Sequence, residues 1–384
     1  MTERSHNYVT LALLVAVCLL LAAAWVLGAY LESDFPDKQP APPPPHPGPV
    51  PPPPIPPVPG NEVTALVDLA LVGEPYYYRG LTVFPVELRR ELDRNDYLTL
   101  DDAFRRGWVE VFETGTVAEL AVQNNARDYV FAMAGEVLAG GKQNRLLRED
   151  VLLPPQSGRI RVPVYCGEQG RWVGDAVGFA HTGKMVPQGL RAAAQERKPQ
   201  EEIWGGIRDK AEAAGVKSPT QDFAAITSDA KVARELGEYG KEIDRIWRPR
   251  HCGMVVASHD RIVGAEVFCN EALFAKLRGK LIESYALDII CKPIAKERDL
   301  EIRKRTWTFA RDDAMRYLQA VYRSRMSYGT TPGAGQAIWL SGAASGRALA
   351  FRGVAVHLCL YQPQPVPLPG PLPRPMPVPE REER

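Results

Sequence analysis

Short apolar stretches with partial two-residue alternation run through the first half of the chain, from about residue 64. They are rich in β-branched side chains and are separated by glycine, proline or polar residues, which is typical of β-strands. One short helix interrupts them, with Asp101 or Asp102 at its start and Gly107 after its end. The predicted strands cover residues 64–72, 81–88, 108–113, 116–124, 129–135, 144–153 and 159–166.

The pattern changes from about residue 187, where apolar positions recur three and four residues apart among alanines and charged residues. This spacing predicts helices. Because strand runs and helix runs are segregated, we predict the α+β class, with a β-rich N-terminal half forming a sandwich- or barrel-like antiparallel sheet and helices inserted in the second half. The predicted helices cover 187–198, 200–215, 228–247, 270–290 and 310–325, a hairpin covers 252–269, and further strands cover 336–342 and 347–361.

An uncharged apolar segment runs from Tyr8 to Tyr30. As a helix it would be about 34 Å long, enough to cross the hydrocarbon core, so we predict a single transmembrane anchor. Arg4 before the segment and Glu32 after it favour a cytoplasmic N-terminus and an extracytoplasmic globular part. A cleaved signal peptide with AAA at 22–24, and retention of the body in the cytoplasm, are the alternatives.

Proline dominates two segments, with 15 copies between residues 36 and 60 and proline at every other position from 363 to 379. Such chains form extended polyproline II rather than a core, and they can bind the aromatic groove of a protein partner. The chain thus divides into a short N-terminus (1–7), the anchor (8–30), a proline-rich linker (31–62), a globular domain (63–361) and a proline-rich tail (362–384).

Charge and cysteine spacing exclude some classes of function. The formal net charge is +1 and no block of five like charges occurs, so we expect no nucleic-acid partner. Among the six cysteines there is no CxxC pair, so no zinc site is predicted. Cys252 and Cys269 lie at the two ends of the predicted hairpin, where they would form a disulfide or, as we favour, remain two buried free thiols.

Two polar stretches, GEVLAGGKQNR (135–145) and CGEQGRW (166–172), stand among the strands. The first is not a P-loop, because Glu136 stands where the first glycine would be and Gln143 replaces the hydroxyl. No GxGxxG is present, and we predict no cofactor. What remains is a turn or bulge between strands, whose glycines allow positive φ or close approach to a ligand.

The side chains of these stretches suit a phosphorylated sugar. Lysine and arginine bind anions, amides bind hydroxyls, and an indole offers a stacking face. The predicted ligand-binding residues are Lys142, Gln143, Asn144, Arg145, Arg171 and Trp172.

Three residues are candidates for chemistry. Glu136 and Glu168 are the predicted general acid and base, if their surroundings differ. Cys166 is a candidate nucleophile with His181 or His251 as basic partner, although a lone cysteine after an apolar strand is more often a core residue. The competing interpretation of both stretches is a solvated polar turn.

The two stretches resemble the ARG and rhodanese-phosphatase-superfamily-associated protein family, a family catalogued as a domain of unknown function. The resemblance implies that Glu136, Gln143, Asn144, Arg145, Cys166, Glu168, Arg171 and Trp172 are its characteristic residues. It implies a link to NAD or ADP-ribose metabolism, hence binding or processing of ADP-ribose or a related nucleotide-sugar phosphate. The alternative is a non-catalytic, membrane-tethered recognition or scaffold domain. The resembling stretches are 80–86, 97–124, 135–145, 151–172 and 262–288.

Overall fold

The computed structural model describes residues 60–171, 177–259, 261–291 and 309–362. The predicted anchor (8–30), most of the linker, the tail after residue 362 and Trp172 lie outside these residues. Within this part of the chain, no helix is both long and apolar enough to cross a bilayer.

The described strands form three sheets, of nine, six and three strands. The large sheet has the order β1-β3-β13-β14-β18-β17-β16-β15, and β2 also pairs with β3. Its strands are β1 (Ala70–Val72), β2 (Tyr76–Tyr78), β3 (Leu81–Leu88), β13 (His251–Ser258), β14 (Arg261–Phe268), β15 (Ser324–Thr330), β16 (Gln336–Gly342), β17 (Ser345–Phe351) and β18 (Val354–Tyr361).

The second sheet has the order β12-β8-β9-β11-β6-β5, and the small sheet has the order β10-β7-β4. Every strand pair in the described part is antiparallel except β4 with β7. The strands are β4 (Leu98–Thr99), β5 (Val109–Glu113), β6 (Glu119–Asn124), β7 (Val130–Ala132), β8 (Glu136–Gly141), β9 (Arg145–Leu147), β10 (Val151–Leu153), β11 (Ile160–Cys166) and β12 (Val177–Met185).

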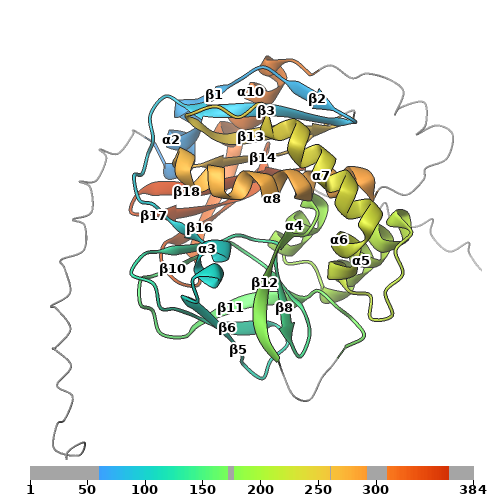
Figure 1. Cartoon of the computed structure of the whole chain (residues 1–384). Coiled ribbons are helices and arrows are strands. Elements are labelled where there is room, and N and C mark those ends of the chain that lie inside the picture. Colours follow the sequence, from blue (N-terminus) through green and yellow to red (C-terminus); the bar gives the residue numbers. More distant parts are fainter. Residues whose placement is uncertain (1–59, 172–176, 260, 292–308, 363–384) are drawn as a thin grey trace, which may run out of the picture. The chain divides into compact units, whose positions relative to one another are not determined.

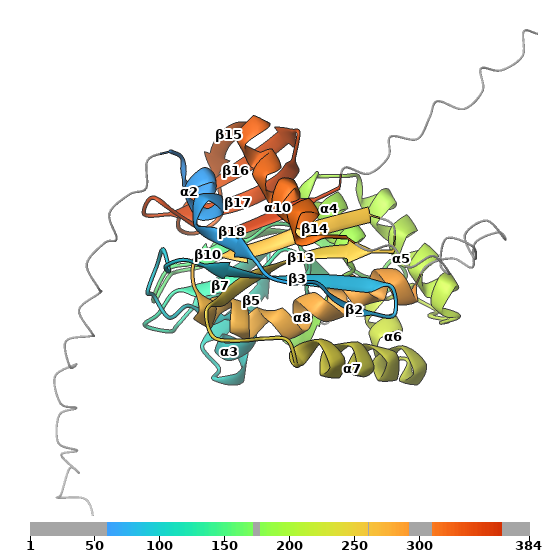
Figure 2. The same ribbon diagram turned by 90° about the horizontal axis from the view of Figure 1, so that it is seen from above.

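Helices cover both faces of the large sheet (Figure 2): α7 and α8 lie on one side, and α2 and α10 on the other. In Figure 1 the second sheet lies beside α3 and below the large sheet. The helices are α2 (Glu62–Leu69), α3 (Leu100–Arg105), α4 (Gln188–Gln195), α5 (Gln200–Ala214), α6 (Phe223–Ser228), α7 (Ala230–Asp244), α8 (Glu271–Ile290), α10 (Arg311–Gln319) and the 3-10 helix η1 (Ala320–Arg323).

The architecture is the predicted one at the level of class: α and β elements mixed, antiparallel sheets and a β-rich first half. Helix α8 begins after Asn270, whose side chain accepts a hydrogen bond from Leu273 N (2.9 Å). The apolar positions Leu273, Leu277 and Leu281 of this helix are all buried in the main core, as an amphipathic pattern requires. A separate core fills the space between α3 and the strands of the second and small sheets.

The prediction of a strand over 64–72 was wrong for most of its length, because α2 occupies Glu62–Leu69 and only Ala70–Val72 is a strand. Asn61 caps this helix: its side chain accepts hydrogen bonds from Val63 N (3.1 Å) and Thr64 N (2.9 Å). Thr64 in turn accepts from Asn61 N, completing a capping box. The local cap and the burial of one helical face outweigh the β-branched composition.

Other boundaries also differ from the predictions. The single strand over 144–153 is two strands in different sheets, β9 and β10, because the polar residues 148–150 between them make contacts with distant residues. The helix over 310–325 ends earlier, and its last residues form η1 and the start of β15. In the polar stretch 135–145 the connection between the two strands is limited to residues 142–144, because Glu136–Gly141 is strand β8 and Arg145 begins β9. Helix α3 has Thr99 as its N-cap rather than an aspartate.

All five cysteines within the described residues are free and buried. This confirms the favoured interpretation of Cys252 and Cys269 as buried thiols. Burial is the main reason that the pKa of Cys252 is raised to about 12.

Candidate functional site

The first polar stretch forms the hairpin between β8 and β9, with Leu138 opposite Arg145. Gly140 and Gly141 have φ of 116° and 55°, which confirms the prediction of positive φ. A Cβ atom on Gly140 would lie 2.5 Å from the carbonyl oxygen of Gly178 in β12, so the neighbouring strand also requires glycine there. These glycines therefore give the backbone the conformation that leads into residues 142–144. We call these three residues the KQN turn.

The KQN turn is bound to the second polar stretch, whose residues Cys166–Arg171 we call the CGEQGR loop. Glu168 accepts hydrogen bonds on Oε2 from Asn144 N (3.4 Å) and from Arg171 Nε (2.7 Å). Arg171 NH2 also donates to Asn144 Oδ1 (3.1 Å), and its NH1 donates to the carbonyl oxygen of Gly141 (3.3 Å). The side chain of Glu168 is 4% exposed and that of Arg171 is 30% exposed. The two loops thus converge, and half-buried Arg171 lies at the solvent edge of the junction, next to exposed Gln169 and Gly170.

Arg145 lies inside this junction and is completely buried. Its NH1 donates to the carbonyl oxygen of Gln143 (2.9 Å), and its NH2 lies 3.5 Å from Glu113 Oε2 of strand β5. Glu113 also accepts a hydrogen bond from the backbone N–H of Lys142 (2.9 Å). Nε and NH2 of Arg145 have no hydrogen-bond partner among the described atoms. Arg145 therefore stabilises the KQN turn from its buried side, through its contacts with Gln143 and Glu113.

Cys166 is also enclosed by this junction. Its thiol donates to Gln143 Oε1 (3.1 Å), and Gln143 Nε2 donates to the carbonyl oxygen of Glu168 (3.1 Å). Burial raises the pKa of Cys166 by more than the nearby guanidinium of Arg145 lowers it. This environment favours the thiol over the nucleophilic thiolate. A nucleophilic role for Cys166 stays a prediction.

A helical segment far along the chain completes the junction. Asn144 Nδ2 donates to both carboxylate oxygens of Asp222, at 3.0 Å each, and Asp222 caps helix α6 through Ala224 N. The backbone N–H groups of Gln169 and Gly170 both donate to the carbonyl oxygen of Thr220 (3.0 Å). Both polar loops are therefore hydrogen-bonded to the connection between α5 and α6.

Glu136 lies at the other end of β8 and makes different contacts. Its carboxylate accepts hydrogen bonds from Met133 N (2.7 Å) and from the ammonium of Lys280 in α8. Lys280 also pairs with Asp101 of α3 (2.7 Å), and Asp101 contacts Nδ1 of His181 (3.0 Å). Burial raises the pKa of Glu136, an effect that Lys280 opposes. The structure thus brings Arg145, Glu168 and Arg171 together but places Glu136 in a separate cluster.

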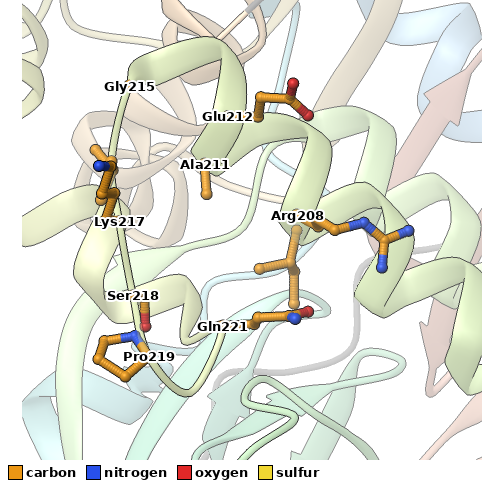
Figure 3. Close-up of a pocket in the computed structure, with 10 residues that line it drawn as sticks. Arg208, Ala211, Glu212, Gly215, Lys217, Ser218, Pro219 and Gln221 are labelled. Carbon is orange, nitrogen blue, oxygen red and sulfur yellow. The ribbon is translucent and has the colours of Figure 1, made fainter.

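A pocket of about 560 Å³ lies between α5 and the loop that follows it (Figure 3), which we call the α5 pocket. In this view Arg208 extends to the right of the helix, and the amide of Gln221 points to the same side. Oε1 of Gln221 is buried and has no hydrogen-bond partner among the described atoms. The lining residues are Ile207, Arg208, Ala211, Glu212, Gly215, Val216, Lys217, Ser218, Pro219 and Gln221.

Sequence reasoning missed the partners that hold the polar loops, namely Glu113, Asp222 and Gln200, as well as the α5 pocket. Gln200 exchanges two hydrogen bonds with the backbone of Cys166 (2.9 and 3.1 Å). A local signal existed only for Asp222, because an aspartate before a short apolar run is a typical N-cap. Nothing local links it to Asn144, 78 residues away.

Residues 70–361 match the family model of the ARG and Rhodanese-Phosphatase-superfamily-associated Protein domain, ARPP-1. The match covers more than half of the chain. The chain belongs to this family. Searches of the curated proteins and of the solved structures found no match. Both polar loops, the α5 pocket and the Glu136 cluster all lie inside the ARPP-1 range.

Proposed function

We propose that this ARPP-1 domain binds a nucleotide-sugar phosphate of the ADP-ribose type in the α5 pocket. The observation that carries the proposal is the attachment of the pocket wall to both polar loops. Thr220, between lining residues Pro219 and Gln221, accepts two hydrogen bonds from the CGEQGR loop, and Asp222 accepts two from Asn144. The polar loops would then hold residues 219–221 of the pocket wall in position, and this role is compatible with the burial of the loops.

The lining suits such a ligand. Its volume lies within the range of small-molecule sites, roughly 300–1,000 Å³. Ile207, Ala211 and Val216 offer apolar surface to a base, whereas exposed Arg208 and Lys217 offer positive charge to a diphosphate. Neither cation forms an ion pair with any described residue. The resemblance stated for the two polar stretches supports the same ligand class, because it implies a link to NAD or ADP-ribose metabolism.

Calorimetric titration of the full-length protein with ADP-ribose tests this proposal. We expect saturable binding, and a loss of about tenfold or more in affinity for the Arg208→Ala/Lys217→Ala variant, because each removes a charge that faces phosphate. Arg234→Ala is the matched control, since Arg234 is an exposed arginine of helix α7 without an ion pair among the described residues. Absence of heat at millimolar ADP-ribose removes the proposal.

We further propose recognition without catalysis as the mode of action. The supporting observation is that both candidate acid–base carboxylates are buried and ion-paired, Glu136 with Lys280 and Glu168 with Arg171. Bound ADP-ribose should therefore stay intact for hours when it is followed by phosphorus NMR. Appearance of products that the Glu168→Gln variant no longer forms would assign processing instead.

We also propose that the segment 8–30 tethers the domain to a membrane, with the proline-rich linker as a spacer. The support is the uncharged apolar sequence followed by a chain that cannot form a core. The full chain should stay in the membrane pellet after an alkaline carbonate wash, and a chain that starts at residue 31 should not. Release of the full chain by the wash would contradict the tether.

A further inference from the structure

Three arginines from separate elements meet where α4 leads into α5. They are Arg148 after β9, Arg197 after α4 and Arg347 in β17, and we call them the arginine cluster. The guanidinium carbons of Arg197 and Arg347 lie 5.7 and 5.4 Å from the ring centre of the same indole, Trp339. The charges of all three arginines also act on the hydroxyl of Tyr165, although burial dominates and raises the pKa of that tyrosine. None of these residues lines the α5 pocket.

Carboxylates compensate this cluster only in part. Glu149 accepts a hydrogen bond from Arg347 NH1 (3.0 Å) and lies 4.0 Å from Arg148 NH2. Arg197 is exposed and forms no ion pair with a described residue. Burial lowers the pKa of Arg347, and Arg197 and Arg148 lower it further, against the effect of Glu149. The arginines therefore repel one another in the state described here.

The cluster borders a small polar cavity with unsatisfied hydrogen-bonding groups. Gln195 and Arg347 line it and are 1% and 7% exposed. Among the described atoms, Gln195 Oε1 and Arg347 Nε have no hydrogen-bond partner, and neither does Arg148 Nε. The cavity offers about 10 Å³, which is room for about one water molecule. A larger anion must therefore lie on the solvent side, between exposed Arg197 and half-buried Arg148.

We infer that the arginine cluster is a second ligand site, which binds the phosphate group of a phosphate monoester. Guanidinium groups form paired hydrogen bonds to phosphate oxygens and remain charged at any physiological pH. Glu149 pairs with these arginines, whereas Asp150 lines the same cavity but pairs with His357. One paired carboxylate for three arginines leaves positive charge that a phosphate of about −1.5 to −2 neutralises better than a carboxylate of −1. A water in the cavity can join Arg347 Nε to Gln195 Oε1 behind the anion.

Titration of the full-length protein with phenyl phosphate, followed by phosphorus NMR and by thermal unfolding, tests this site. We expect phenyl phosphate to raise the unfolding temperature and benzoate at the same concentration to do so much less. Arg197→Ala should weaken phenyl phosphate binding about tenfold. Arg352→Ala is the matched control: Arg352 is also exposed, also has positive φ (52°, against 59° for Arg197), and also lies over an aromatic ring.

Gln195→Glu provides an independent variant that does not remove an arginine. Its carboxylate would occupy the position of an unsatisfied acceptor beside Arg347, so we expect an unfolding temperature at least as high as the wild type and no response to phenyl phosphate. The inference is overturned if Arg197→Ala and Arg352→Ala bind phenyl phosphate equally well, or if benzoate binds as tightly. A response that persists in Gln195→Glu at wild-type strength also overturns it.

Discussion

Several residues that the sequence suggested for ligand binding or acid–base chemistry are buried in the fold. Arg145 is fully buried and Glu168 and Asn144 are only 3% and 6% exposed. Their hydrogen bonds run to backbone groups and to neighbouring side chains, which satisfies buried polar atoms that would otherwise destabilise the fold. Nε and NH2 of Arg145 are exceptions, with no hydrogen-bond partner among the described atoms. The high density of polar residues in the two stretches therefore indicated a structured contact. The sequence could not tell whether those residues contact a ligand or another loop of the same chain.

Asn144 is the residue at which this junction is best tested. Asn144→Ala removes both hydrogen bonds to Asp222 and the bond from Gly140 N to Asn144 Oδ1 (2.9 Å). We expect the free energy of unfolding to fall by about 1–3 kcal/mol, because half-buried Asp222 loses both hydrogen bonds from Asn144 and keeps only the one from Ala224 N. Urea denaturation measures this loss. Asn125→Ala, at an exposed asparagine bonded to Glu110 (2.8 Å), should cost much less, and equal losses would contradict the argument.

At the scale of elements, two ion pairs join helix α8 to the second sheet: half-buried Lys184 of β12 pairs with Glu283 (2.7 Å), and buried Lys280 pairs with Glu136 of β8. Lys280 reaches Glu136 in β8 and Asp101 in α3. Burial lowers the pKa of Lys280, but the two carboxylates outweigh it and raise that pKa, so the ammonium form is retained. The sequence showed α8 as an amphipathic helix. It did not show that Lys280 and Ser284 of this helix face inward, because their partners are distant in sequence.

Lys280→Met should reduce the free energy of unfolding by about 3–5 kcal/mol, because Glu136 then remains buried without a counter-ion. The double variant Lys280→Met/Glu136→Gln should recover much of this loss in the same urea experiment. Lys276→Met is the control on the same helix: its ammonium pairs with exposed Asp96, so a loss of about 1 kcal/mol or less is expected. A double variant no more stable than Lys280→Met alone would contradict this account.

At the scale of the whole described domain, a buried histidine joins the large sheet to the residues before β10. His357 of β18 contacts Asp150 Oδ2 (2.6 Å) and Glu266 Oε2 (2.9 Å) and is completely buried. Burial lowers the pKa of His357, but the two carboxylates outweigh it and raise the pKa to about 9. Burial raises the pKa of Glu266, but Arg191 and His357 outweigh it and lower the pKa to about 2.

These shifts predict a window of stability. The contribution of His357 is fully present below its unfolded pKa of about 6.5 and is lost as the pH rises through 9. The contribution of Glu266 is present above about pH 4.5 and is lost as the pH falls through 2. The difference in unfolding free energy between wild type and His357→Gln should therefore shrink by about 3 kcal/mol from pH 6 to pH 9.5.

Urea titrations across this pH range measure the difference. His251→Gln is the control: because burial lowers the pKa of His251, its contribution should rise slightly from pH 6 to about pH 7.5 and stay constant above that. A difference between wild type and His357→Gln that is constant from pH 6 to 9.5 would rule out the charged histidine.

The sequence by itself determined the α+β class, strands β3, β5 and β11, the amphipathic helix α8 and the glycines that allow the KQN turn. Each of these depends on residues close together in the chain, through alternation, helical spacing or backbone freedom. Only the tertiary structure decided that 62–69 is a helix, that β18 pairs with β14, and that Asn144 meets Asp222 while Glu136 meets Lys280, 144 residues away. A local pattern can indicate that a polar side chain will need a hydrogen-bond or ion-pair partner. Which residue becomes that partner depends on how distant elements pack.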